Sequence, residues 1–226
     1  MNKNNLKSVA IFPSLISSDI LNIRRTLDHL DKYVDGYHLD IMDDHFVPNL
    51  TWGPLFINEI AHATKKILFV HLMVEKPESW LSRLTLRDGD TLAFHIENKV
   101  DHISFINSIK EKKIKSSIAI SPKTPLEKIL GLANVIDQIL LMSVEPGASG
   151  QSFIESSIGR LKSLVEFRRQ HNLGFKIVMD GGINQENISQ LTEIGVDQVA
   201  CASSIFGSGD SVENIIKLRE AIDIIF

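Results

Sequence analysis

The sequence predicts a single-domain α/β fold, a (β/α)8 TIM barrel that takes in residues 1–226. Three observations predict it. Short β-rich runs alternate with helical stretches from one end of the chain to the other, eight of each kind are present, and no Pro-, Ser- or Gly-rich linker divides them. Eight β-then-α units in 226 residues favour a closed barrel over the alternative, an open doubly wound sheet.

The expected strands are short runs of β-branched and other apolar residues. They cover residues 9–12, 37–42, 67–73, 91–96, 116–120, 138–142, 175–179 and 198–201. Ligands of such barrels bind at the carboxyl ends of the strands, so functional side chains are expected just before and just after each strand end.

The expected helices lie between these strands and form the scaffold. They cover residues 19–33, 54–63, 103–112, 154–170, 187–193 and 212–225, with weaker helical patterns after Pro77 and Pro125. Pro54, Pro77 and Pro125 stand where a helix should begin, because the fixed φ of proline and its missing N–H suit the first helical turn.

The composition is that of an ordinary globular protein. Apolar residues make up 43% and charged residues 23% of the chain, and the formal net charge is −4. Such a chain offers no basic field for nucleic acid, and it has no run of about eighteen apolar residues that could span a bilayer. We therefore expect no nucleic-acid partner and no membrane partner.

The number of cysteines indicates the cellular compartment in which the protein folds. Cys201 has no second cysteine to pair with and is expected to pack as a small apolar side chain. The apolar stretch near the N-terminus is too short for a signal peptide. Both observations predict a protein of the reducing cytoplasm.

The second expected strand places unusual side chains on one face. His38, Asp40 and Met42 alternate with apolar residues, so all three point the same way, into the barrel, while the apolar set packs under the helices. For this strand alone, a buried structural His–Asp pair is an equal alternative to a functional site.

Two further strand ends favour the functional interpretation. His71 and Met73 are two apart near the end of the third strand, and Asp180 follows the seventh strand directly. Two imidazoles and two carboxylates from three strands suit a divalent ion such as zinc or iron(II), and manganese or cobalt would also be accepted. The predicted ligands of one metal ion are His38, Asp40, His71 and Asp180.

Three small-residue loops at neighbouring strand ends form a second group. They contain the residues Gly147, Ala148, Ser149 and Gly150, then Gly181 and Gly182, then Ala202 and Ser203. Backbone N–H groups of such loops make a site for an anion, and barrels often hold a phosphate near the seventh and eighth strands. The sequence therefore predicts a small phosphorylated ligand.

Other polar residues give weaker evidence of a functional role. His95 and Glu97, two apart at the end of the fourth strand, are expected at the rim or behind the ligands. The acidic residues Asp40, Asp43 and Asp44 suggest the D-x-K-x-x-D pattern of decarboxylating barrels, but position 42 is methionine. Without a lysine there, such a reaction lacks its proton donor.

Several motifs together resemble one family, the ribulose-phosphate 3-epimerases, from about residue 11 to residue 207. The motifs lie at residues 13–17, 38–43, 46–49, 70–74, 142–147, 150–153, 180–184 and 205–207. The resemblance implies a (β/α)8 barrel that inverts carbon 3 of a ketose phosphate with one divalent metal ion. The reaction expected first is the interconversion of D-ribulose 5-phosphate and D-xylulose 5-phosphate in the pentose phosphate pathway.

The resemblance also assigns roles to matching positions. It implies that the four predicted metal ligands include the two acid/base groups, Asp40 and Asp180, and that Ser14 and His71 contact the substrate. Three methionines would line the pocket as walls that do not titrate, with the filling of gaps in the core as their alternative role. The three small-residue loops would hold the phosphate. The methionines are Met42, Met73 and Met142.

Some positions depart from the family pattern, so the identity of the sugar phosphate substrate stays open. The family usually has glycine, asparagine, phenylalanine-glycine and glycine where this chain has Asp44, Ser121, Ala148-Ser149 and Ala202. The alternatives are a D-allulose 6-phosphate 3-epimerase or related ketose-phosphate epimerase and, from another class, a phosphosugar-binding barrel without catalysis. A homo-oligomer is expected.

Overall fold

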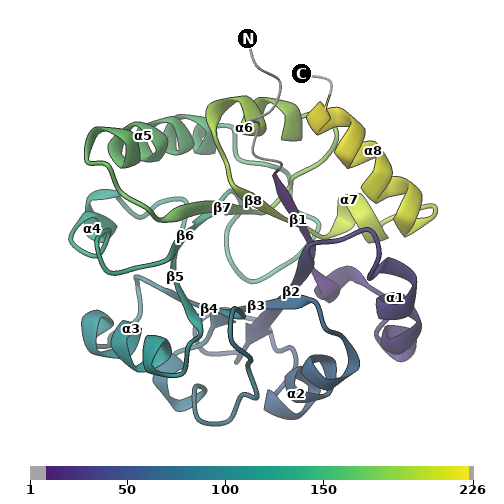
Figure 1. Cartoon of the computed structure of the whole chain (residues 1–226), viewed down its shortest axis with the longest axis horizontal. Helices are drawn as coiled ribbons and strands as arrows, with labels where there is room; N and C mark the ends of the chain where they lie inside the picture. Colours follow the sequence, from purple (N-terminus) through teal and green to yellow (C-terminus); the bar gives the residue numbers. More distant parts are fainter. Residues whose placement is uncertain (1–8, 224–226) are drawn as a thin grey trace.

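The computed structural model describes residues 9–223, in which eight parallel strands form a ring with the helices packed outside it (Figure 1). The strands are β1 (Ala10–Pro13), β2 (Gly36–Met42), β3 (Ile67–Met73), β4 (Thr91–His95), β5 (Lys115–Ile120), β6 (Gln138–Met142), β7 (Lys176–Asp180) and β8 (Gln198–Cys201). Their order in the sheet is β1-β8-β7-β6-β5-β4-β3-β2. The predicted barrel is confirmed.

The ring of strands closes between β1 and β2 through an isolated bridge and not through a continuous ladder. Ser14, just after β1, pairs with His38 of β2 in an isolated parallel bridge. Ser14 also donates its backbone N–H to Cys201 O of β8, at 2.8 Å. The closing bridge therefore lies at the residues that the sequence analysis selected as functional.

The helices follow the expected order with different lengths. They are α1 (Ile23–Leu30), α2 (Pro54–Ala63), α3 (His102–Glu111), α4 (Glu127–Leu130), α5 (Ser156–Gln170), α6 (Ile188–Ile194), α7 (Ser203–Phe206) and α8 (Ser211–Asp223), with 3-10 turns η2 (Leu15–Ser17), η3 (Ile20–Asn22) and η4 (Pro77–Ser79). The expected helix over 212–225 is α8 as far as residue 223, and its last two residues lie outside the described part of the chain.

Two helix predictions need correction. The expected helix over 19–33 is the turn η3 followed by α1, because the Asp19 carboxylate accepts hydrogen bonds from Leu21 N and Asn22 Nδ2 and so favours a tight local turn. After Pro77 the described connection to β4 contains η4 and no α-helix. Its last turn is held instead by Asp90, which accepts from Arg87 N at 2.7 Å and also from Leu68 N of β3 at 2.8 Å.

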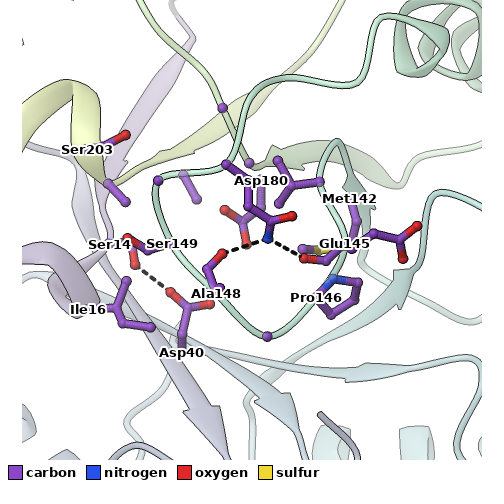
Figure 2. A pocket seen from close by; sticks show the side chains of 18 of the residues that line it. Ser14, Ile16, Asp40, Met142, Glu145, Pro146, Ala148, Ser149, Asp180 and Ser203 are labelled. Atoms are coloured by element: carbon purple, nitrogen blue, oxygen red, sulfur yellow. Dashed lines mark hydrogen bonds between the residues drawn. The ribbon is translucent and has the colours of Figure 1, made fainter. Parts of the chain in front are cut away.

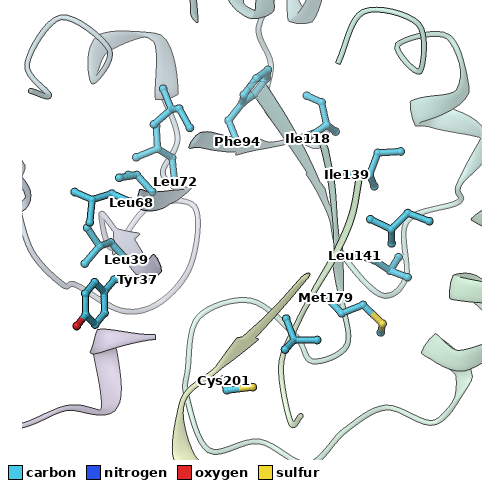
Figure 3. Packing of buried hydrophobic residues seen from close by; sticks show 14 of the residues in the cluster. Tyr37, Leu39, Leu68, Leu72, Phe94, Ile118, Ile139, Leu141, Met179 and Cys201 are labelled. Carbon is cyan, nitrogen blue, oxygen red and sulfur yellow. The ribbon is translucent and has the colours of Figure 1, made fainter. Parts of the chain in front are cut away.

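The main core lies between the strands and the helices, as the alternation predicts. Tyr37 and Leu39 of β2 are fully buried in this layer (Figure 3), and so is Ile41 of the same strand. Cys201 is buried there too, which confirms its expected role, and burial raises the pKa of its thiol to about 12. In the part of the chain that the structure describes, no helix is long and apolar enough to cross a membrane.

Candidate active site

The strand register brings two predicted ligands together. Asp40 of β2 and His71 of β3 are direct partners in the parallel ladder, so their side chains leave the same face side by side. Asp40 Oδ1 lies 3.1 Å from His71 Nδ1 and 3.1 Å from His38 Nε2. Both imidazoles are fully buried, so the geometry is set by the strands and shielded from water.

The fourth predicted ligand reaches the same point from β7. Asp180 Oδ2 lies 3.5 Å from His38 Nε2 and 3.6 Å from His71 Nδ1. Ser143, a buried residue to which the sequence analysis gave no role, fixes this strand end by donating its N–H to Asp180 O at 2.8 Å and its hydroxyl to Gly181 O at 2.7 Å. The ligand atoms of His38, Asp40, His71 and Asp180 all lie within 4.8 Å of one another.

The charges of this cluster fit a divalent ion. Burial alone would lower the pKa of His38, but the carboxylates of Asp40 and Asp180 outweigh it and raise that pKa to about 10. Burial opposes ionisation of Asp40 as well, yet His38 and His71 hold the pKa of Asp40 well below its usual range. Protons on the imidazoles thus balance two buried carboxylates, and a divalent cation held by the same nitrogen and oxygen donors would balance them equally.

Ser14 orients the Asp40 carboxylate. Its hydroxyl donates to Asp40 Oδ2 at 2.5 Å (Figure 2). Because Oδ2 is held in this way, Oδ1 is the oxygen that faces the imidazoles. The two oxygens of Asp40 therefore have different surroundings, one toward the histidines and one toward Ser14.

A pocket opens above the cluster at the carboxyl ends of the strands. The structure brings the two predicted acid/base residues and nearly all predicted substrate contacts to its walls. They are Ser14, Asp40, Met42, Met73, Met142, Gly147, Ala148, Ser149, Gly150, Asp180, Gly181, Gly182, Ala202 and Ser203. His71 does not line the pocket and lies buried beneath it.

Part of this wall is not predicted by the sequence pattern. Ile16, Val144, Glu145, Pro146 and Gln151 also line the pocket. Ile16 lies in the 3-10 turn η2 and the other four lie in the loop after β6, where no strand alternation indicates which way a side chain points.

The loop after β6 curves around the pocket and is tied to two other loops (Figure 2). Ser149 Oγ lies 2.7 Å from Ser17 Oγ, and Asn49 Nδ2 donates to Gly147 O at 2.9 Å. Within the loop, Gln151 Nε2 donates to Glu145 O at 2.7 Å. The loop therefore has a defined position over the cluster.

Two glycines of the predicted anion site are required by close packing. Gly181 has φ +116°, and a Cβ there would lie 2.4 Å from Val144 Cγ2. Gly182 has φ +65°, and a Cβ there would lie 2.4 Å from Phe153 N. No lysine or arginine is among the described residues that line the pocket, so backbone N–H groups and hydroxyls are the donors that its walls offer an anion.

His95 lies behind the cluster, one of the two places that the sequence analysis allowed. Its Nε2 is 2.9 Å from His71 Nε2, and its Nδ1 is 3.1 Å from Glu97 Oε2. Burial lowers the pKa of His95 to about 4. For Glu97, burial is outweighed by hydrogen bonds from His95 and Thr124, which lower the pKa of the carboxyl to about 2.

One departure from the family pattern has a direct structural outcome. Asp44 adopts φ +59°, the left-handed region in which glycine is usual and aspartate is tolerated better than most residues. Its backbone N–H still donates to Asn49 O at 2.8 Å. The loop after β2 therefore keeps its turn without a glycine at this position.

Fold and site together define a (β/α)8 barrel with two histidines and two carboxylates gathered beneath a pocket at the strand ends. Residues 10–206 match the model of the ribulose-phosphate 3 epimerase family. The chain belongs to this family and is an isomerase of the epimerase class.

Individual relatives are similar in sequence to this protein over nearly the whole chain. The chain is 33% identical over 218 residues to the ribulose-phosphate 3-epimerase of Synechocystis sp., covering 95% of each chain. It is 34% identical over 218 residues to the cytoplasmic isoform of ribulose-phosphate 3-epimerase from Oryza sativa subsp. japonica, covering 94% of each. A crystal structure of 3-keto-L-gulonate-6-phosphate decarboxylase from Vibrio cholerae has the same fold, with a TM-score of 0.70, 16% identity, and coverage of 97% of this chain and 99% of that one.

Proposed function

We propose that the protein interconverts D-ribulose 5-phosphate and D-xylulose 5-phosphate by moving the proton on carbon 3 between Asp40 and Asp180. The observation that carries this proposal is the convergence of these two carboxylates, from β2 and β7, on one pocket and on the same two imidazoles. Inversion at carbon needs one group to remove a proton and a second group to return one from the other side. One pocket with two carboxylates on different walls meets that need.

The proposed roles follow from the surroundings of each carboxylate. Ser14 donates to Asp40 Oδ2 and keeps this oxygen turned away from the imidazoles, where it can take up or release the substrate proton. Ser143 fixes the backbone of Asp180 and Gly181, so the second carboxylate is held on the wall formed by β7. Positioning of both groups is part of the rate advantage, in addition to about a hundredfold to ten-thousandfold from each acid/base group.

The four converging donors would hold one divalent metal ion, and its proposed identity is zinc or iron(II), with manganese or cobalt as substitutes. Such an ion supplies Lewis-acid stabilisation of the negative charge that develops on the substrate oxygens when the proton beside the carbonyl leaves. His38 and His71 hold no substrate proton in this proposal, since both are buried and face the carboxylates.

The three methionines are proposed to exclude water. Met42, Met73 and Met142 line the pocket and are at most 3% exposed. Their thioethers do not titrate, so they leave proton transfer to the two carboxylates and keep bulk water from the reacting carbon.

The phosphate is proposed to lie among the small-residue loops at the ends of β6, β7 and β8. What supports this is that Gly150, Gly182 and Ser203 line the pocket at these strand ends, together with the absence of a cationic side chain among the described pocket residues. Affinity for the phosphate would then come from backbone N–H groups and hydroxyls.

Location and assembly remain proposals as well. A relative of this chain is named as a cytoplasmic isoform, which supports the cytoplasm as the location of this protein. The homo-oligomer expected from the sequence stays a prediction, and size-exclusion chromatography with light scattering would measure it.

The function is tested by assaying D-ribulose 5-phosphate and D-allulose 6-phosphate side by side with one metal-analysed preparation. We expect the kcat/KM for D-ribulose 5-phosphate to be at least ten times the kcat/KM for D-allulose 6-phosphate. A preference for the six-carbon sugar would assign the protein to the alternative epimerase. Tight binding of both sugars without turnover by metal-loaded protein would support the phosphosugar-binding alternative and contradict the proposal.

A further inference from the structure

A chain of three side chains, two of them fully buried, runs outward from the proposed metal site. His71 Nε2 lies 2.9 Å from His95 Nε2, and the two rings are stacked with centroids 5.0 Å apart. On the far side of its ring, His95 Nδ1 lies 3.1 Å from Glu97 Oε2. Both histidines are fully buried, so water does not compete for the contact between the two rings, while the Glu97 side chain is 24% exposed.

The protons along this chain can be assigned from hydrogen-bond chemistry. Two imidazole nitrogens that face each other at 2.9 Å share one proton, so one of them donates and the other accepts. His71 Nδ1 is the nitrogen that faces Asp40 and the metal position, and a ligating nitrogen must carry no proton. The His71 proton therefore sits on Nε2, and His95 Nε2 accepts it.

The same reasoning fixes the proton on His95. Since His95 Nε2 accepts, the neutral ring carries its proton on Nδ1, which faces the carboxylate of Glu97. A carboxylate is the acceptor that suits this donor. One arrangement of protons then satisfies every contact from Glu97 to His71.

Glu97 itself is held from the outside of the barrel. Its Oε1 accepts from Thr124 Oγ1 at 2.5 Å and from Ser121 N at 3.0 Å, which leaves Oε2 for His95. Arg160 of α5 supports both donors, because it donates to Thr124 O at 2.7 Å and to Ser121 O at 3.1 Å. The chain is thus anchored on α5 and on the loop after β5.

We propose that His95 and Glu97 are positioning residues that hold His71 in the orientation and tautomer that metal binding requires. The inference rests on the proposed metal site. Without the acceptor at His95, the His71 ring is free to place its proton on Nδ1 or to rotate, and either change removes a ligand. Outer partners of ligating histidines typically contribute about 10–100-fold to metal affinity.

The test measures binding of Co²⁺ alone, by its visible absorption and by competition with a chelator, in the full-length metal-stripped protein. His95→Phe keeps a flat ring beside His71 but offers no acceptor, and we expect it to weaken Co²⁺ binding about 10–100-fold. His95→Gln restores an acceptor oxygen and should recover most of that affinity. A purely structural role predicts no such recovery.

Two further variants keep the test decisive. Glu97→Gln has the same size but cannot accept from all three donors around Glu97, so it should weaken Co²⁺ binding even if His95→Phe fails to fold. Thr91→Val is the matched control, because Thr91 lies on the same strand and bonds Gln138, far from the ligands. It should leave the Co²⁺ affinity within about twofold of wild type.

Two results would overturn the inference. One is wild-type Co²⁺ affinity in folded His95→Phe or Glu97→Gln, and the other is an equal loss in Thr91→Val. Failure of the wild-type protein to bind Co²⁺ or Zn²⁺ is a different outcome, which would remove the proposed metal site and this inference with it.

Discussion

Asp40 and His71 are ladder partners on β2 and β3, and Asp40 Oδ1 lies 3.1 Å from His71 Nδ1. This contact is made by backbone register, since residues paired in a parallel ladder project side by side from the same face. His38, two residues before Asp40, points the same way. Three of the four proposed ligands therefore come from two adjacent strands, and their arrangement does not depend on a mobile loop.

The first prediction concerns the two carboxylates. Asp40→Asn and Asp180→Asn each replace a proton acceptor by an amide of the same shape, and each should lower kcat at least about a hundredfold. The surviving carboxylate still serves one side of the substrate. Each variant should therefore exchange the hydrogen at carbon 3 of only one of the two epimers with solvent, as followed by NMR in D2O.

The control for these variants is their metal content, because both residues are proposed ligands as well. Metal analysis on the assayed samples separates loss of the ion from loss of the acid/base group. Near-normal turnover by metal-loaded Asp180→Asn would remove Asp180 from its proposed role.

The second prediction concerns metal removal. The buried carboxylates need positive charge, and the donor set fits a divalent ion, so a chelator should abolish epimerisation and added Zn²⁺ or Fe²⁺ should restore it. Thermal unfolding should shift in parallel, with the midpoint rising as the ion is added back. Full activity in protein verified as metal-free would contradict the proposed mechanism.

The third prediction concerns the pH dependence of the metal-free protein. Burial opposes the charge on His38, but Asp40 and Asp180 outweigh it and raise its pKa from 6.5 to about 10. A group whose pKa is higher in the folded state stabilises the fold fully below its unfolded pKa and stops doing so above the folded one. The free energy of unfolding of metal-free protein should therefore fall between about pH 6.5 and 10.

Urea unfolding at a series of pH values measures this slope. His38→Gln has no titrating ring and serves as the control, so its unfolding free energy should fall less over the same interval. Equal slopes in the two proteins would show that His38 is not protonated in the metal-free fold.

The fourth prediction concerns the phosphate. Substituting valine for Gly181 is an unsuitable test, because any Cβ there collides with Val144 whether or not phosphate binds. Ser203 is exposed at the pocket wall and offers a cleaner change. Ser203→Asp adds a negative charge that should raise the KM for D-ribulose 5-phosphate at least about tenfold with little change in kcat.

The neutral control is Ser203→Asn, because asparagine has the same shape as aspartate but no charge. This variant should raise the KM much less than Ser203→Asp does. Unphosphorylated D-ribulose should be a poor substrate for the wild type, because it lacks the remote binding energy that positions carbon 3. Similar kcat/KM values for the free and the phosphorylated sugar would show that the loops do not bind phosphate.

The sequence predicted the strands and the ligand cluster well because both depend on a period of two. His38, Asp40 and Met42 share the inner face of β2 as the alternation required. The contact between His71 and His95 was within reach of the same logic. His71 pairs with Ala93 of β4, so His95 is the next inward residue beyond it.

Other features depend on contacts that no local pattern records. The helix expected over 19–33 begins only at Ile23, because the Asp19 side chain accepts a hydrogen bond from the backbone N–H of Leu21. Helix α7 has four residues, too few for a helical period to be visible. The contact between Ser17 and Ser149 joins residues 132 apart and depends on the complete barrel.

The central claim is tested most directly by incubating metal-loaded protein with D-ribulose 5-phosphate in D2O and recording the NMR spectrum of the product. Transfer between Asp40 and Asp180 predicts D-xylulose 5-phosphate with one deuterium at carbon 3, because the second carboxyl group has exchanged with the solvent and delivers a deuteron. Product that retains its original hydrogen at carbon 3, or no product from metal-loaded protein, would contradict it.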